Sequence, residues 1–253
     1  MIERLVASPR ARRLAVRLGA DRPVRAWRSR FPSAAAARDR QDNEHLGVLL
    51  AALLDPDSNC VDVGGNVGSV IGRIVELAPE GTHHVFEPIP ELAASLRARF
   101  PRVQVHELAL SNVSDEERDF AFVRSRPGYS GFRERRFPGR EEIEGIVVRT
   151  ARLDEVLPAG YAPTFVKIDV EGAELEVMQG AVETMTRHRP VVVFEHGLGA
   201  SDFYGTRPED VFDLLVGEVG YRLFDLDGNG PYTREQLATT FAEGRRWNFV
   251  ARA

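Results

Sequence analysis

The feature of this sequence that most constrains its fold is a repeated alternation of short apolar segments with amphipathic ones. Segments with strand character lie at 60–63, 84–86, 103–105, 120–123, 146–148, 164–169, 191–195, 221–224 and 247–251. Apolar residues at helical spacing separate most of them, at 42–54, 70–75, 90–100, 172–181 and 208–219. This alternation predicts right-handed crossovers and a doubly wound α/β domain. We expect about seven strands in a mostly parallel sheet, with helices on both faces and an antiparallel last strand.

The N-terminal part of the chain differs in charge from the rest. Residues 1–41 carry eleven arginines against three acidic residues, although the net charge of the whole 253-residue chain is −5. We interpret 1–41 as a basic, solvated helical extension, with contact to an anionic surface or a carrier protein as the alternative. Residues 42–253 then form the main domain. An arginine-rich insertion at about 115–150 interrupts its regular pattern and is expected to form part of the substrate wall.

Composition narrows the setting in which the protein works. Cys60 is the only cysteine, which excludes an internal disulfide framework and a zinc site built from several thiolates. We therefore expect a reducing, cytoplasmic location. No apolar run approaches the roughly 20 residues that span a bilayer, so we expect no transmembrane segment. The oligomeric state stays open, with a homo-oligomer as one option.

A glycine-rich turn follows the first strand and marks a nucleotide-type site. Gly64, Gly65 and Gly68 stand where the backbone must come close to a ligand. A dinucleotide would place its pyrophosphate here, and Asp62 at the strand end would repel it. We expect Asp62 to attract the cationic ammonium and sulfonium of S-adenosylmethionine instead. Glu87, at the end of the second strand, is placed to accept the ribose hydroxyls.

Two further strand ends carry candidate catalytic residues. Asp169 and Glu171 follow the strand 164–169, and Glu195 with His196 ends the neighbouring strand. Because ligands of open α/β sheets bind at the carboxyl ends of the strands, Asp169 is expected to face the cleft. Its structural alternative is to cap the helix that follows. Histidine beside two carboxylates is a candidate general base.

The order of these motifs resembles the FkbM family of methyltransferases. The resemblance covers about residues 57–200 and is carried, in sequence letters, by VDVGGNVG at 61–68, FEP at 86–88, LDE at 153–155, KIDVEGAE at 167–174, GA at 180–181 and FE at 194–195. Gly65 departs from the alanine that is commoner in the family. The resemblance implies a Rossmann-like class I methyltransferase fold and O-methylation of a hydroxyl, on a sugar, a glycolipid or a secondary metabolite.

The expected sites follow from the motifs and the resemblance together. The cofactor-binding set for S-adenosylmethionine is Asp62, Gly64, Gly65, Asn66, Gly68, Glu87, Pro88, Leu110 and Asp169. The catalytic set is Asp169, Glu195 and His196, with Asp169 or His196 as the base. In one variant the same three residues hold Mg²⁺ or Mn²⁺.

The expected partner is a small-molecule or glycan acceptor. We expect no nucleic-acid substrate, because the catalytic region is acidic and phosphate contacts require the opposite sign. Two alternatives remain, each on the same sheet: an NAD-dependent oxidoreductase, and a non-catalytic cofactor-binding module.

Overall fold

The computed structural model describes residues 34–134 and 141–253. The chain divides into two compact units, Met1–Glu44 and His45–Ala253. Of the first unit, the described part is the beginning of helix α4 (Ala34–Leu53), where Arg38 pairs with Asp42 one turn later. The predicted extension over 1–41 lies mostly outside the described residues, and its division from the main domain stays a prediction. Helix α4 itself begins before position 42, where the sequence predicted a start.

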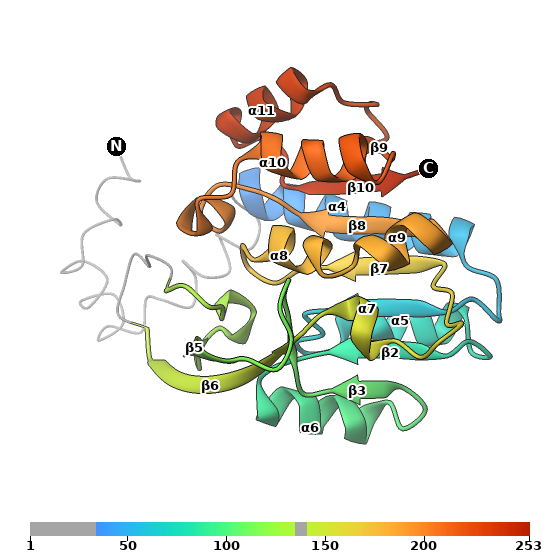
Figure 1. Ribbon diagram of the computed structural model, residues 1–253, viewed down its shortest axis with the longest axis vertical. Coiled ribbons are helices and arrows are strands. Elements are labelled where there is room, and N and C mark those ends of the chain that lie inside the picture. Colours follow the sequence, from blue (N-terminus) through green and yellow to red (C-terminus); the bar gives the residue numbers. More distant parts are fainter. Residues whose placement is uncertain (1–33, 135–140) are drawn as a thin grey trace, which may run out of the picture. The chain divides into compact units, whose positions relative to one another are not determined.

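The second unit is built on a seven-stranded sheet in the order β3-β2-β1-β7-β8-β10-β9 (Figure 1). Strands β3, β2, β1, β7 and β8 are parallel, and β10 runs antiparallel to both β8 and β9. The bounds are β1 Cys60–Val63, β2 His83–Phe86, β3 Gln104–His106, β7 Phe165–Ile168, β8 Val191–Glu195, β9 Arg222–Asp225 and β10 Asn248–Arg252. The predicted fold, with its antiparallel last strand, is confirmed.

Helices cover both faces because successive residues of each strand point to opposite sides. One apolar cluster joins Cys60, Val85, Phe165 and Val193 to helices α4, α5 (Ser69–Leu77) and α6 (Pro90–Arg99). The other joins the alternate strand residues, such as Val63 and Phe194, to the second group of helices. That group comprises α8 (Glu174–Gln179), α9 (Val182–His188), α10 (Pro208–Phe212) and α11 (Arg234–Glu243).

The helices differ from the sequence expectation in detail. The segment predicted as one helix over 172–181 forms α8 and is followed by a separate α9, while 208–219 forms α10 and a π-helical stretch, Asp213–Glu218. Short elements also occur at α7 (Leu153–Val156), η1 (Pro127–Tyr129) and η2 (Ser201–Tyr204). None of the described helices is both long and apolar enough to cross a membrane.

The predicted insertion folds as a small sheet of its own. Strand β5 (Glu117–Val123) pairs antiparallel with β6 (Ile143–Ala151), and β6 pairs in parallel with β4 (Ala109–Leu110). A third apolar cluster, which contains Phe120 and Phe122, lies beneath it. Both strands expected here form and are longer than predicted.

Candidate functional site

The strand register brings the predicted site residues into one row. Four parallel strands align the residues Phe86, Val63, Ile168 and Phe194 across the sheet. The residues directly after them are Glu87, Gly64, Asp169 and Glu195. They lie at the edge of the sheet formed by the carboxyl ends of the parallel strands. From β1 the chain continues to β2 on one side, and β7 later pairs with β1 on the other side. Open α/β sheets bind ligands at such a switch point.

The glycine turn lets the chain after β1 pass close to the chain after β7. The backbone N–H groups of Gly64 and Gly65 both donate to Phe86 O, at 2.9 and 3.1 Å. Gly64 has a φ of +85°, and a Cβ built on it would lie 1.9 Å from the carbonyl oxygen of Asp169. Any other residue would force these two segments apart. Asn66 follows in the left-handed region with φ of 44°.

The Asp62 side chain is buried and contacts the start of helix α5. Its side chain is only 2% exposed, and Oδ2 accepts a hydrogen bond of 3.1 Å from the backbone N–H of Ile71 in helix α5. Burial raises its pKa to about 7, with Lys167 acting in the opposite direction. The Asp62 carboxylate therefore connects strand β1 to helix α5, on the two sides of the glycine turn. The expected contact between Asp62 and a cofactor ammonium stays a prediction.

Glu87 connects the glycine turn to the segment after β2. Its Oε2 accepts from the backbone N–H of Asn66 at 2.8 Å, and its Oε1 accepts from that of Ile89 at 2.9 Å. Burial raises the pKa of Glu87, while these two hydrogen bonds lower it. Each carboxylate oxygen can accept more than one hydrogen bond, so the group keeps capacity for ligand hydroxyls. Pro88, between Glu87 and Ile89 in the sequence, is half-buried.

Asp169 lies at the surface end of a buried ion pair. The ammonium of Lys167, in β7, donates to Asp169 Oδ2 at 3.2 Å and to Ile168 O at 3.3 Å. The Lys167 side chain is 4% exposed and that of Asp169 is 39% exposed. Asp169 therefore meets solvent at the carboxyl edge, as predicted, while Lys167 supports it from the interior.

A buried acid that the sequence did not single out holds the loop after Asp169. Glu174 Oε1 accepts from the N–H groups of Val170 and Gly172, at 3.1 and 3.0 Å. Glu171 and Gly172, in the same loop, have φ of 59° and 114°. Burial raises the pKa of Glu174 to about 7. The signal was present in the sequence, because Glu174 ends the quoted motif that begins at Lys167.

Glu195 and His196 point to opposite faces of the sheet. Glu195 lies on the Lys167 side, and burial, then the charge of Asp169, raises its pKa well above the usual value. His196 is 1% exposed and stacks on Phe241 of α11, with ring centroids 4.7 Å apart. Burial lowers its pKa to about 4. The alternation of side chains along a strand explains this separation.

The metal-binding variant is therefore corrected. Across residues 34–134 and 141–253, no group of three or more His, Cys, Asp or Glu side chains is arranged to hold a metal ion. Asp169 and Glu195 share a face, but His196 lies on the other. The ammonium of Lys167 is the cation that the structure places beside these two acids.

The insertion reaches the glycine turn. A Cβ built on Gly128, in η1, would lie 2.9 Å from Asn66 Nδ2. The Asn66 Oδ1 atom is buried and has no hydrogen-bond partner among the described residues. Leu110, the remaining predicted cofactor residue, is buried in β4 and belongs to a core cluster. The substrate-wall role of the insertion stays a prediction.

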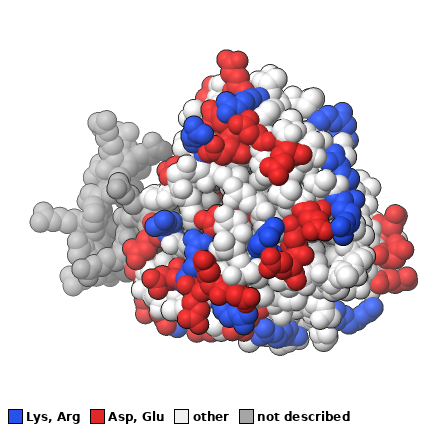
Figure 2. All heavy atoms as spheres, in the orientation of Figure 1, with Lys and Arg blue, Asp and Glu red and all other residues white. Residues whose placement is uncertain are grey.

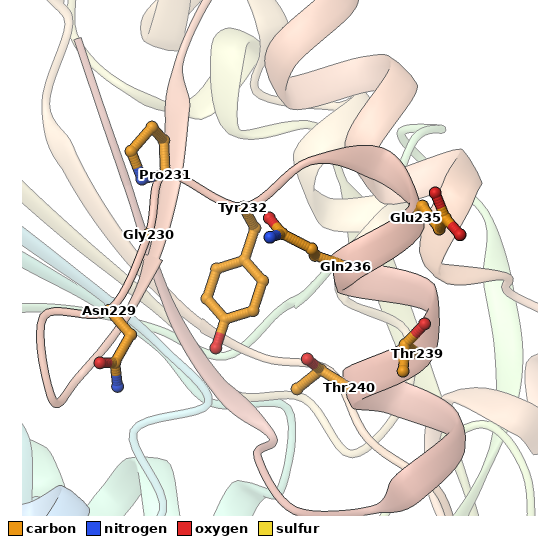
Figure 3. Close-up of a pocket in the computed structure, with 8 residues that line it drawn as sticks. All are labelled: Asn229, Gly230, Pro231, Tyr232, Glu235, Gln236, Thr239 and Thr240. Carbon is orange, nitrogen blue, oxygen red and sulfur yellow. The ribbon is translucent and has the colours of Figure 1, made fainter.

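A separate groove of about 440 Å³ lies beside α11 (Figure 3). Three of its polar side chains hold the loop between β9 and α11. Tyr232 Oη and Asn229 Nδ2 donate to Asp225 Oδ2 at 3.1 and 2.9 Å, and the side chain of Gln236 accepts from Thr233 N at 2.9 Å.

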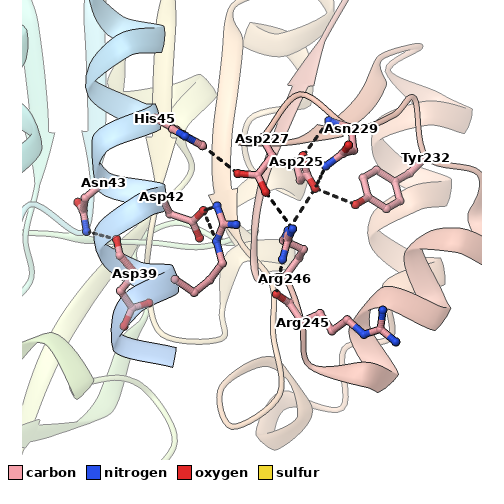
Figure 4. Close-up of polar contacts among 11 residues, drawn as sticks. Asp39, Asp42, Asn43, His45, Asp225, Asp227, Asn229, Tyr232, Arg245 and Arg246 are labelled. Carbon is pink, nitrogen blue, oxygen red and sulfur yellow. Dashed lines mark hydrogen bonds and ion pairs between the residues drawn. The ribbon is translucent and has the colours of Figure 1, made fainter. Parts of the chain in front are cut away.

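The acids next to this groove surround an arginine (Figure 4). Arg246 Nε donates to Asp225 Oδ2 at 3.3 Å, and its Nη2 donates to Asp227 Oδ2 at 2.8 Å. The spacing of Asp225, Asp227 and Asn229 is that of the first ligands in a calcium loop. The guanidinium stands between the two carboxylates and ties the loop to the chain entering β10. On the face shown in Figure 2, acidic and basic side chains are interspersed over the described residues.

Comparison with known proteins decides the family. The model of the Methyltransferase FkbM domain matches residues 62–223, a range that includes the predicted site residues from Asp62 to His196. The chain belongs to the FkbM methyltransferase family. The family resemblance stated from the motifs is confirmed.

Two curated methyltransferases are similar to this FkbM-family chain. The 2-O-methyltransferase NoeI of Sinorhizobium fredii is 30% identical over 161 residues, which cover 56% of this chain and 64% of NoeI. The chain thus spans less than two thirds of the length of NoeI. The hexuronic acid methyltransferase AglP of Haloferax volcanii is 27% identical over 182 residues, 70% of each chain. The crystal structure of methyltransferase FkbM from Methylobacillus flagellatus KT aligns with a TM-score of 0.49 and 15% identity, over 79% of this chain and 44% of that one.

Proposed function

We propose that this protein transfers a methyl group from S-adenosylmethionine to a hydroxyl of a sugar, a glycolipid or a secondary metabolite. The family match supports methyl transfer. The names of the two curated relatives, a 2-O-methyltransferase and a hexuronic acid methyltransferase, support a sugar hydroxyl as the first acceptor to test.

The observation that carries the cofactor assignment is the arrangement of Glu87 with Asn66. The Glu87 carboxylate is held by two backbone amides at the edge beside the switch point. A ribose presents two hydroxyl donors, and a fixed carboxylate is the acceptor that suits them. The buried Oδ1 of Asn66 adds an acceptor without a partner among the described residues. The residues present therefore fit an adenosine group.

The charge at this edge favours a cationic cofactor over a dinucleotide. Asp62, Asp169 and Glu195 surround the single ammonium of Lys167. A pyrophosphate placed over the glycine turn would meet the Asp169 carboxylate, which is 39% exposed at this edge. S-adenosylmethionine carries a sulfonium and an ammonium, so its amino-acid end suits the same surroundings.

The reaction would form a carbon–oxygen bond and break a carbon–sulfur bond. When bound, the cofactor supplies the methyl group on a cationic sulfur, and the protein aligns it with the acceptor. Alignment of this kind lowers barriers by roughly 7–11 kcal/mol. We assign the acceptance of the hydroxyl proton to Asp169, because its side chain is 39% exposed at the edge. His196 is buried on the other face of the sheet.

Calorimetry with S-adenosylhomocysteine and with NAD tests the cofactor. We expect S-adenosylhomocysteine to bind and NAD not to bind. Glu87→Ala should weaken binding by about tenfold or more, as loss of a charged hydrogen-bond acceptor worth about 1.5–3 kcal/mol implies. Glu218→Ala, on an exposed residue, serves as the control. Binding of NAD alone would favour the oxidoreductase alternative.

An acceptor panel tests the reaction. Hexuronic acids, neutral sugars, a glycolipid and a polyketide alcohol are incubated with S-adenosylmethionine, and mass spectrometry detects replacement of a hydroxyl hydrogen by methyl. We expect a methylated sugar product whose formation Asp169→Asn slows by about 10²-fold or more. Cofactor binding without any methylated product in the panel would favour the non-catalytic alternative.

A further inference from the structure

Lys167 is the only lysine of the chain, and every other basic residue except histidine is arginine. It lies in β7, the central strand, where its neighbours in register are Asp62 of β1 and Val193 of β8. The residue is 3% exposed. A lysine ammonium is compact, whereas a guanidinium is planar and needs a wide fork of acceptors. A compact ammonium therefore suits this buried position.

The surroundings of this ammonium are acidic on every strand next to it. Asp62 faces it from β1, Asp169 from the end of β7, and Glu195 from β8. Glu171 and Glu174 lie close to Glu195 in turn, and Glu87 lies close to Asp62. Burial alone would lower the pKa of Lys167, but these carboxylates, Asp169 first, more than offset it and raise the pKa. The ammonium is therefore charged.

The contacts of the ammonium are directed at the candidate base. The ammonium donates to Asp169 Oδ2 and to the carbonyl oxygen of Ile168. These two hydrogen bonds hold both the side chain of Asp169 and the peptide group that precedes it. Without a buried cation, the carboxylates of Asp62 and Glu195 would lose their nearest counter-charge. Unpaired buried charges are costly, so the acidic side chains at the carboxyl edge would rearrange or take up protons.

We propose that Lys167 is a positioning residue that holds the Asp169 carboxylate at the cleft and serves as the internal counter-cation of Asp62 and Glu195. This inference rests on the proposed function for the part that concerns cofactor and acceptor. The ion cluster itself can be measured whether or not a cofactor binds.

The first measurement uses the single lysine as a spectroscopic probe. Protein with ¹⁵N in the lysine side chain gives one ammonium signal besides the natural-abundance background. We expect Asp169→Asn to shift this signal clearly in the absence of any ligand, whereas Glu218→Gln on the surface leaves it unchanged. A signal that ignores Asp169→Asn would overturn the ion pair and with it the proposal.

The second measurement separates positioning from packing. Lys167→Met keeps the aliphatic chain and removes the charge, and Lys167→Arg keeps the charge. Arg187→Met, which breaks an exposed ion pair with Glu183 on α9, is the matched control. We expect Lys167→Met to lower the turnover with the acceptor by about tenfold or more, Lys167→Arg to recover part of it, and Arg187→Met to have no effect.

A double variant completes the test. If Lys167 acts through Asp169, then Lys167→Met combined with Asp169→Asn should be no slower than Asp169→Asn alone. Losses that multiply would overturn the proposal. Should Lys167→Met fail to fold, Lys167→Arg and the lysine signal in Asp169→Asn still decide it. A wild-type protein that does not bind S-adenosylhomocysteine would refute the proposed function, while the signal shift would still report on the ion cluster.

Discussion

Replacement of Gly64 by alanine adds one methyl group at the most crowded point of the candidate site. The new Cβ would lie 1.9 Å from the carbonyl oxygen of Asp169 and 2.9 Å from its carbon. Both atoms belong to the backbone, and Asp169 N donates to Val63 O at 3.0 Å, so this segment cannot move away cheaply. The φ of +85° adds a second penalty. Left-handed backbone costs an L-residue about 1–2 kcal/mol, and overpacking costs about 1–3 kcal/mol.

We therefore expect Gly64→Ala to lower the free energy of unfolding by about 2–5 kcal/mol, measured by urea denaturation. Two control glycines separate the contributions. Gly160 has a φ of +82° with nothing within 4 Å of an added Cβ, so Gly160→Ala should lose only about 1–2 kcal/mol. Gly145 has neither a positive φ nor a neighbour within 4 Å, and Gly145→Ala should be near neutral. A Gly64→Ala protein no less stable than Gly160→Ala would refute the close approach of the two strand ends.

Three further predictions concern buried groups. Glu174→Ala leaves two backbone N–H groups without acceptors and should lower the free energy of unfolding by about 2–4 kcal/mol. Glu174→Gln keeps an oxygen acceptor and should lower it by less than half of that. Equal losses of stability in the two variants would contradict the assigned hydrogen bonds. His196 is neutral in the folded protein down to a pKa of about 4 but has a reference pKa of 6.5, so the unfolded chain binds more protons between these values and stability falls as the pH falls through that window. The full effect of this shift on the free energy of unfolding is about 3 kcal/mol. His196→Leu removes the group, so the loss of stability between pH 6.5 and 4 should be smaller than in the wild type by up to that amount. Parallel curves of unfolding free energy against pH for the two proteins would exclude burial of a neutral ring. Leu50 is 0% exposed and Val48 on the same helix is 69% exposed, so Leu50→Ala should lose about 2–5 kcal/mol and Val48→Ala less than about 0.5 kcal/mol in thermal or urea unfolding; similar losses would show that α4 is not packed as described.

The sheet could be predicted from the sequence because local pattern and fold agree there. Segments such as Cys60–Val63 and Val191–Glu195 are short, apolar and β-branched, and their bounds in the structure match the expectation. Helix α11 was missed, although Thr233 and Gln236 form a capping box at its start. Its first turns are polar, and the apolar spacing used to find the other helices is weak in this segment.

The candidate site was predicted in position but not in orientation. Strand ends place Glu87, Asp169 and Glu195 on one edge, and this follows from a parallel sheet alone. The alternation of side chains along a strand separates Glu195 from His196, and this alternation can be read from the sequence alone. The direction of the Asp62 carboxylate cannot, because it depends on the backbone N–H of Ile71 in the next helix.

The sequence motifs did not show which positive charges lie beside the acidic side chains. In one variant, the acids of the carboxyl edge were expected to hold a metal ion, and the structure places the ammonium of Lys167 beside them. Arg246 does the same for Asp225 and Asp227, although it lies far along the chain from both. Lys167 begins the quoted motif at 167–174, but its position beside Asp62 of β1 and Glu195 of β8 follows only from the packing of separate strands.

A crystal structure with S-adenosylhomocysteine bound is the most direct measurement of the central claim. The account predicts that both ribose hydroxyls donate to the carboxylate of Glu87, with the sulfur over the gap between β1 and β7 and the Asp169 carboxylate facing it. A cofactor seated elsewhere, or a Glu87 carboxylate that keeps only its two backbone amides and touches no ribose, would contradict it.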